Sequence, residues 1–271
     1  MARHLSAEDK ALIEAAERGD IVGVRAALGA GANASALLET SAPSEFNSEL
    51  STEFTYRRTT PLMKALRGNF LDIAKLLVSA GADPNEYADN GTPLKVACAK
   101  GFYDLTVALI SAGAKNLNEG LEAAASNGHL EIVNLLIMAG ATLSRLTLAC
   151  ACGFPHKNMG YAPVVATLID AYREDVKNDE IALPFAARHG HLDIVRMLLS
   201  AGVDVNCKTS TYDETALMEA SWNNHIEIVK ELLAAGASSD DKTGQGHTVL
   251  NPPHWQKISP EIVRTIKRAM R

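Results

Sequence analysis

The run ALGAGANAS at residues 27–35 contains the residue types of a phosphate-binding loop. Gly29, Gly31 and Ala34 match the loose dinucleotide fingerprint G-x-G-x-x-A, whose glycines let backbone amides approach a pyrophosphate. A loop of that kind follows a strand and opens a helix, whereas this run closes a helical stretch. The partial negative charge of a helix C-terminus repels phosphate. The run therefore predicts a helix end, and we expect no cofactor.

A second stretch with possible chemistry is CACGFPH, which contains Cys150, Cys152 and His156. On a helix, the two thiols of a Cys-x-Cys pair point about 200° apart. A structural zinc site needs four ligands, and no fourth is evident, so we expect no metal. The histidines follow a recurring turn rather than a nucleophile–base pattern, and neither a P-loop nor G-x-S-x-G occurs. We expect the protein not to be an enzyme.

The composition is that of a folded water-soluble chain. Of 271 residues, 47% are hydrophobic, and the formal net charge of −6 does not favour nucleic acid or an anionic membrane as partner. No apolar run approaches the length of a membrane span, and MARHLSAEDK lacks the apolar core of a secretory signal. Four irregularly spaced cysteines favour a reducing compartment. We expect a cytoplasmic protein, or one delivered into a host cytosol.

The elements that carry these residues recur along the chain. GHLEIVNLLIMAGA (128–141) returns as GHLDIVRMLLSAGV (190–203) and NHIEIVKELLAAGA (224–237), and each copy follows a short Ala-rich stretch. Apolar residues at helical spacing predict a helix, a tight turn and a second helix. A left-handed turn explains why only Gly or Asn stands between the helices. The turn residues are Gly19, Asn69, Gly101, Gly128, Gly153, Gly190 and Asn224.

The segment DNGTPLKVACAKGFYDLTVALISAGA (89–114) resembles the ankyrin repeat family in its turn, T-P-L, Ala-rich helix, glycine and second helix. The resemblance implies an all-α fold, an ankyrin-type α-solenoid of about seven helix-turn-helix repeats with short β-turn fingers. It covers nearly the whole chain, so we expect a single ankyrin repeat domain over residues 1–271. Each unit buries its apolar face only against a neighbour.

The array departs from regularity in several places. Successive turn residues lie 50, 32, 27, 25, 37 and 34 positions apart, against a family period of about 33. The first insertion, about residues 35–58, is rich in Ser, Thr and Glu and predicts a mobile loop, either a tolerated surface insertion or a recognition loop. A second insertion, FPHKNMGYAP (154–163), enlarges the turn of the fifth unit. The two short spacings predict that units four and five lack most of their fingers.

The C-terminal segment, about residues 247–271, predicts a cap. Pro252 and Pro253 interrupt a first helix, and Ser259–Pro260–Glu261 is a favourable start for a last one. Its apolar positions are Ile262, Val263, Ile266 and Met270. The basic residues elsewhere on this helix leave two interpretations open, a terminal cap with a polar outer face or a basic amphipathic helix for a membrane or a calmodulin-like partner.

In the family, fingers and outward positions of the first helices face a groove that binds other proteins. The resemblance therefore implies a non-catalytic protein–protein interaction module, such as an adaptor, an inhibitor or a bacterial effector or immunity-type binder; the alternative is a structural subunit or assembly chaperone. Trp222 stands at a nominally exposed position, or else packs against the neighbouring finger. The predicted partner-binding residues are Lys64, Arg67, Tyr87, Asn90, Lys100, Arg188, His189, Tyr212 and Trp222.

Overall fold

The structure is a computed structural model that describes residues 5–43, 54–88, 91–144, 146–153, 161–254 and 256–271. His156, Asn90 and most of the second predicted insertion lie outside these ranges. The chain divides into two compact units, Met1–Gly120 (unit 1) and Leu121–Arg271 (unit 2). The single domain expected over residues 1–271 stays a prediction.

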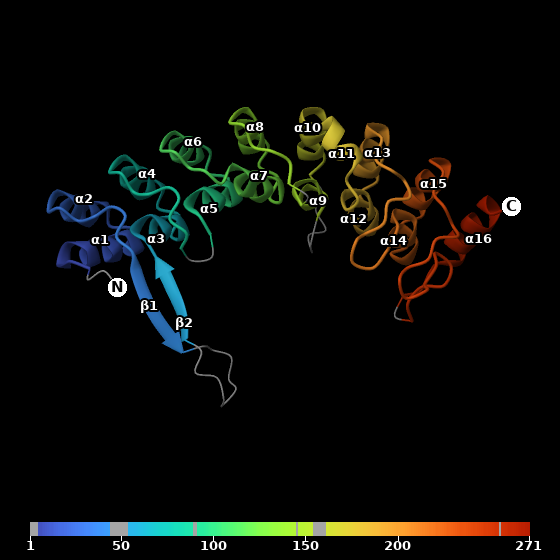
Figure 1. The fold of residues 1–271 in the computed structure, drawn as a ribbon, viewed down its shortest axis with the longest axis horizontal. Coiled ribbons are helices and arrows are strands. Elements are labelled where there is room, and N and C mark those ends of the chain that lie inside the picture. Colours follow the sequence, from blue (N-terminus) through green and yellow to red (C-terminus); the bar gives the residue numbers. More distant parts are fainter. Residues whose placement is uncertain (1–4, 44–53, 89–90, 145, 154–160, 255) are drawn as a thin grey trace. The chain divides into compact units, whose positions relative to one another are not determined.

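Unit 1 consists of helical hairpins and one β-hairpin (Figure 1). In each helical hairpin the first helix packs against the second, and successive first helices pack against one another, as do successive second helices. The elements are α1 (Ala7–Arg18), α2 (Ile21–Gly29), β1 (Leu38–Pro43), β2 (Phe54–Thr59), α3 (Pro61–Arg67), α4 (Leu71–Ser79), α5 (Pro93–Lys100) and α6 (Tyr103–Ser111). Helix α7 (Leu117–Ala125) spans the division between the units.

Unit 2 repeats the same pattern, with first helices in one layer and second helices in the other (Figure 1). A short helix, α11, interrupts the pattern after the fifth predicted unit. The elements are α8 (Leu130–Met138), α9 (Thr147–Ala151), α10 (Ala162–Ala171), α11 (Arg173–Lys177), α12 (Ala182–His189), α13 (Leu192–Ala201), α14 (Ala216–Trp222), α15 (Ile226–Ala234) and α16 (Pro260–Ala269).

The left-handed turns predicted between the helices are confirmed. All seven turn residues have positive φ, from 59° at Asn69 to 104° at Gly153. At Gly128 a ring also occupies the space of a side chain, because an added Cβ would lie 2.4 Å from a Tyr161 ring atom. Gly140, which follows α8 with a φ of 91°, has nothing within 4 Å of an added Cβ. Gly128 is therefore required for two reasons and Gly140 for one.

This difference gives a matched test of packing within unit 2. We expect Gly140→Ala to lower the free energy of unfolding by about 1 kcal/mol, because alanine is strained at positive φ. Gly128→Ala should lower it by roughly 2 kcal/mol more, because the Tyr161 ring must also move. Urea titration followed by circular dichroism measures both values. Equal losses of unfolding free energy in the two variants would show that the Tyr161 ring moves aside at little energetic cost.

Polar side chains fix the ends of the helices. Thr60, Thr92 and Thr215 are buried and accept the backbone N–H three residues ahead, which caps α3, α5 and α14. Asn206 joins neighbouring turns, because its amide accepts from the Ser238 N–H at 2.7 Å and donates to the Gly236 carbonyl. These bonds satisfy the backbone groups that helix ends leave open.

The first insertion contains regular structure that the sequence interpretation missed. Strands β1 and β2 form an antiparallel pair in register from Leu38 with Thr59 to Pro43 with Phe54. Residues 38–43 and 54–59 of the predicted mobile loop are therefore strands, and the mobility of the segment stays a prediction. Composition alone misled, because strand pairing satisfies backbone groups without a large apolar face.

The predicted loss of fingers agrees with the helix bounds. Residues 112–116 alone separate α6 from α7, and residues 139–146 separate α8 from α9. Fingers closed by isolated β-bridges occur where the sequence retains them, at Ala88 with Gly91 and at Lys208 with Thr215. A further bridge joins Thr248 to Asn251, ahead of the buried Pro253.

The last helix begins where the sequence predicts. The Ser259 hydroxyl accepts the Ile262 N–H, and Pro260 occupies the first turn of α16. Ile262 and Ile266 are buried, and α16 packs against α15, whereas Met270 is half exposed. The turn residue Asn224 fixes the backbone at the start of this helix, because its side-chain oxygen accepts from the Ser259 N–H at 2.7 Å.

Candidate functional site

The lysines predicted for a partner in unit 1 are engaged within the unit. The Lys64 ammonium lies 2.6 Å from the Glu17 carboxylate of the neighbouring first helix. The Lys100 ammonium donates to the Leu66 carbonyl at 2.9 Å, to the Arg67 carbonyl at 3.2 Å and to the Asn69 side chain at 2.6 Å. These acceptors lie at the C-terminal end of α3, where a cation complements the helix dipole. Lys100 thus joins α5 to α3, and its contact with a partner stays a prediction.

The β-hairpin is tied to the first finger by one arginine. Arg58, on β2, contacts Glu39 of β1 at 3.2 Å and Glu86 of the finger at 3.0 Å. Tyr87, the residue after Glu86, is 56% exposed, and Arg67 at the end of α3 is also exposed. We call Arg58, Arg67, Glu86 and Tyr87 the unit 1 surface. The sequence predicts Tyr87 and Arg67 as partner-binding residues. Arg58 and Glu86 are candidates only because the structure shows that they form an ion pair beside Tyr87 in the chain.

The predicted residues of unit 2 gather around α12, α14 and the finger between α13 and α14. Tyr212, on that finger, is 58% exposed. The Arg188 guanidinium, at the end of α12, lies 5.9 Å from the centre of the Phe185 ring. The His189 ring, half-buried, lies 6.3 Å from the Phe185 ring and 6.2 Å from the His191 ring.

Trp222 corrects the sequence interpretation. It was expected at an exposed position, but its side chain is 4% exposed and every residue of α14 is buried. Helix α14 packs against both α12 and α15. Trp222 therefore belongs to the core of unit 2 rather than to an open contact surface, and its packing against the neighbouring finger stays a prediction.

A charged residue that the sequence analysis did not single out lies beside these positions. Glu219, on α14, is 3% exposed, and one of its carboxyl oxygens lies 3.5 Å from Arg188 Nε. Burial raises the pKa of Glu219 to about 8, although Arg188 acts in the opposite direction. The equivalent place five residues before the turn holds Lys64, Val96 or Phe185 in other units, so no pattern could have predicted it. We call the exposed Arg188 and Tyr212, with the half-buried Glu214, the unit 2 surface.

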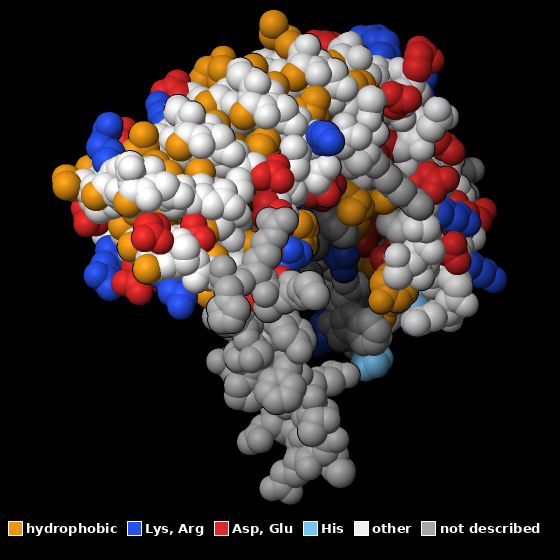
Figure 2. All heavy atoms as spheres, turned by 60° about the vertical axis from the view of Figure 1, so that its left-hand side comes forward, with side chains coloured by type: hydrophobic (Ala, Val, Ile, Leu, Met, Phe, Trp, Pro, Cys, Tyr) orange, Lys and Arg blue, Asp and Glu red, His pale blue; other side chains and the backbone are white. Residues whose placement is uncertain are grey.

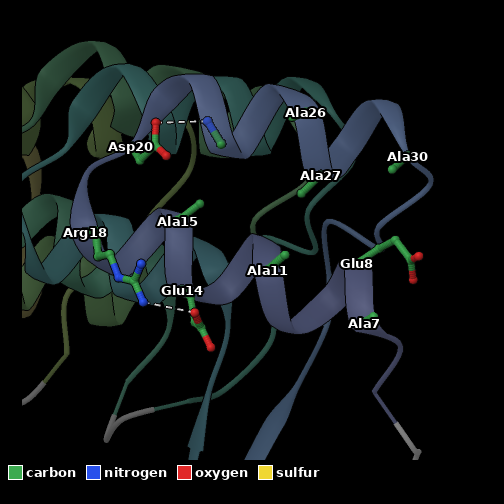
Figure 3. A pocket seen from close by; sticks show the side chains of 11 residues that line it. Ala7, Glu8, Ala11, Glu14, Ala15, Arg18, Asp20, Ala26, Ala27 and Ala30 are labelled. Carbon is green, nitrogen blue, oxygen red and sulfur yellow. Dashed lines mark hydrogen bonds and ion pairs between the residues drawn. The ribbon is translucent and has the colours of Figure 1, made fainter.

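A separate hollow of about 550 Å³ lies on the outward face of α1 and α2 (Figure 3). Small residues line most of it, and Gly23 and Ala27 stand where the next hairpin has Ile73 and Leu77. The hollow therefore corresponds to missing side chains. Two of the charged residues that line the hollow, Glu14 and Arg18, pair with one another at 3.0 Å. We therefore assign no small-molecule binding site to this hollow.

Exposed apolar side chains on the second helices are dispersed. Val22 on α2 and Tyr103 on α6 are exposed. Figure 2 turns the α1–α2 end of unit 1 forward and shows apolar side chains lying singly or in small groups between charged and other ones. Such dispersed residues are normal on a protein surface.

Ligands for a metal do not gather in the described part of the chain, where no group of three or more His, Cys, Asp or Glu side chains could hold an ion. The four cysteines are buried and unpaired with one another. Burial raises the pKa of Cys98 and of Cys207 to about 12, so these thiols are poor nucleophiles. Among the described residues, we find no helix with the length and apolar character to cross a bilayer.

Paired helices, left-handed turns and bridged fingers together define a helical repeat protein. The family model for ankyrin repeats (3 copies) matches residues 62–147 and 121–243, which together make up more than half of the chain. The chain belongs to the ankyrin repeat family, and the predicted membership is confirmed.

One relative with an assigned role shares a segment of this chain. It is a probable E3 ubiquitin-protein ligase of Oryza sativa subsp. japonica, 36% identical over 93 residues. The match covers 31% of this chain and 18% of that protein. The chain thus matches less than a fifth of this relative's length.

Proposed function

We propose that this chain is a non-catalytic protein-binding protein, acting as an adaptor, an inhibitor or an effector or immunity-type binder in the cytoplasm. Ankyrin repeats generally mediate protein–protein interaction. The proposal includes about seven repeats, with α16 as a terminal cap, and a protein as partner rather than nucleic acid, a membrane or a small-molecule cofactor. The segment shared with a probable ubiquitin ligase is consistent with a common binding part, and we propose no ligase activity.

The observation that carries the proposal is the pair of exposed finger tyrosines. Tyr87 and Tyr212 are 56% and 58% exposed on fingers whose backbones are closed by β-bridges. A tyrosine brings a large contact area with little loss of conformational entropy on binding. Each has a charged neighbour in the sequence, Glu86 before Tyr87 and Asp213 after Tyr212, and Glu86 pairs with Arg58. Aromatic residues beside arginine are the types enriched in binding hot spots.

Cross-linked capture from the native host, followed by mass spectrometry, tests this proposal. We expect a reproducible protein partner whose recovery falls at least about 10-fold with Tyr87→Ser or Tyr212→Ser, because a central aromatic contributes roughly 2 kcal/mol. Val22→Ser and Met138→Ser are matched controls, since both residues are exposed on second helices, and they should leave recovery unchanged. A partner lost equally with the control variants would contradict the proposed surfaces.

A further inference from the structure

Four basic residues form one stripe along α16, because they stand at positions i, i+3, i+4 and i+7 of the helix. They are Arg264, Lys267, Arg268 and Arg271. All four are exposed, and none forms an ion pair with a described residue, whereas cations such as Lys64 and Arg196 do. The opposite face of α16 holds the buried Ile262 and Ile266 and packs against α15. That apolar face is thus taken up within unit 2 rather than free to enter a bilayer.

This stripe, which we call the basic stripe, works against the helix that carries it. Like charges three or four positions apart lie side by side on a helix and destabilise it. Lys267 and Arg268 in the last turn gain from the helix dipole, but Arg264 stands before that turn. Glu261, in the first turn, is the acidic residue of α16. An acidic surface laid on the basic stripe would therefore relieve a repulsion that the helix itself does not compensate.

An acidic surface of this kind exists on the first helical hairpin of the same chain. Residues 7–20 contain five acidic residues and two basic ones. On the outward face of α1 and α2, Glu8, Glu14 and Asp20 line the hollow of about 550 Å³ (Figure 3). Arg18 is the cation of this lining, and Glu14 already pairs with it. The acidic face defined by these residues therefore has charge opposite to the basic stripe and space for long side chains.

Both faces belong to helices that pack against the array on one side. Helix α1 packs against α3, α2 against α4, and α16 against α15. Helices within the array have neighbours on both sides, as α3 has α1 and α5, and α4 has α2 and α6. In a repeat protein each unit is covered by the next one. A second copy of the chain would cover the acidic face with a helix of opposite charge.

We propose that the basic stripe of one copy docks on the acidic face of a second copy. The aliphatic stems of the arginine and lysine side chains pack over the alanines of the hollow, and their charged heads reach Glu8, Glu14 and Asp20. Such a contact joins two different surfaces, so each copy keeps one of them free and further copies add head to tail. The proposal goes beyond the proposed function and involves neither Tyr87 nor Tyr212.

Sedimentation velocity of the full chain tests the proposal without knowledge of any other partner. The protein is measured from about 5 to about 200 µM, so that mass action favours association at the upper end. At about 50 mM NaCl we expect the weight-average mass to rise with concentration to at least that of two chains. At about 500 mM NaCl it should fall back toward that of one chain, because salt screens contacts between exposed charges.

Two charge-reversed proteins make the test specific to these two surfaces. One combines Lys267→Glu with Arg268→Glu in the basic stripe, and the other combines Glu8→Lys with Glu14→Lys in the acidic face. Each alone should associate at least about 10-fold more weakly than the wild type, because like charges then face one another. An equimolar mixture of the two should associate again, since the intact basic stripe of one protein meets the intact acidic face of the other.

Lys242→Glu and Glu131→Lys are matched controls, because both residues are exposed outside the two surfaces, and they should associate like the wild type. Circular dichroism checks that every variant is folded. A chain that stays monomeric at low salt, association that survives both reversals, or a mixture that stays monomeric would overturn the proposal. A monomeric chain that binds phosphatidylserine vesicles through the basic stripe would also overturn it. None of these outcomes affects the proposed function, which is tested at Tyr87 and Tyr212.

Discussion

Replacing Trp222 by alanine is expected to lower the free energy of unfolding of unit 2 by about 3–5 kcal/mol. The side chain is 4% exposed on a helix that is buried throughout, so its removal leaves a large cavity. An exposed hot-spot residue would instead leave stability unchanged and affect only binding. Urea titration followed by circular dichroism separates the two cases without knowledge of the partner.

Two further variants make the Trp222 test specific. Tyr212→Ala removes an aromatic ring from the same unit, but that ring is 58% exposed, so stability should change by less than about 0.5 kcal/mol. Trp222→Phe keeps an aromatic ring and removes an N–H that has no partner in the described structure, so it should be tolerated far better than alanine. A Trp222→Ala protein that unfolds like the wild type would contradict the burial of this residue.

The features that the sequence predicts well are those with a local cause. A residue such as Asn69 or Gly101 must adopt positive φ between two helices, and few residue types tolerate this conformation. Because the requirement recurs in every unit, the repeat spacing also predicts which fingers are short. The start of α16 at Ser259 and Pro260 follows from capping chemistry, which likewise depends on a few adjacent residues.

The features that the sequence misjudges depend on neighbours distant in the chain. Helical periodicity places Trp222 on the outer face of its own helix, but the side chain is buried, on a helix that packs against α12 and α15. Lys100 also has a nominally outward position in its helix, yet the carbonyl groups at the end of α3 hold its ammonium. Whether a position faces solvent or an adjacent unit depends on the neighbouring repeats, which single-helix periodicity cannot show.

The β-hairpin illustrates a limit of composition. The flanks of the first insertion look polar, so the sequence predicts a mobile loop, yet the backbone groups of 38–43 and 54–59 pair with one another. The contact of Arg58 with Glu86 then fixes the hairpin to the first finger. This ion pair joins residues 28 positions apart in the sequence, and the repeat pattern contains no signal for it because the insertion has no counterpart in other units.

Glu219→Gln is expected to change how the stability of unit 2 depends on pH. Burial raises the pKa of Glu219 to about 8 in the folded state, above its ordinary value of 4.5. The folded protein therefore holds a proton that the unfolded chain releases between these values, and wild-type stability falls as pH rises from about 4.5 to about 8. Glutamine remains neutral and retains similar size. The variant should gain on the order of 4 kcal/mol relative to the wild type between pH 4.5 and pH 8.5.

Urea titrations of both proteins at a series of pH values measure this effect. At pH 4.5 the two free energies of unfolding should lie close together, because both side chains are then neutral in the folded state. Above pH 8 the difference should become constant, since the carboxyl group is ionised in both states of the wild type. Glu131→Gln, on the exposed surface of α8 in the same unit, is the control and should follow the wild type. Parallel curves for Glu219→Gln and the wild type would show that Arg188 compensates the buried carboxylate fully, and would contradict the raised pKa of Glu219.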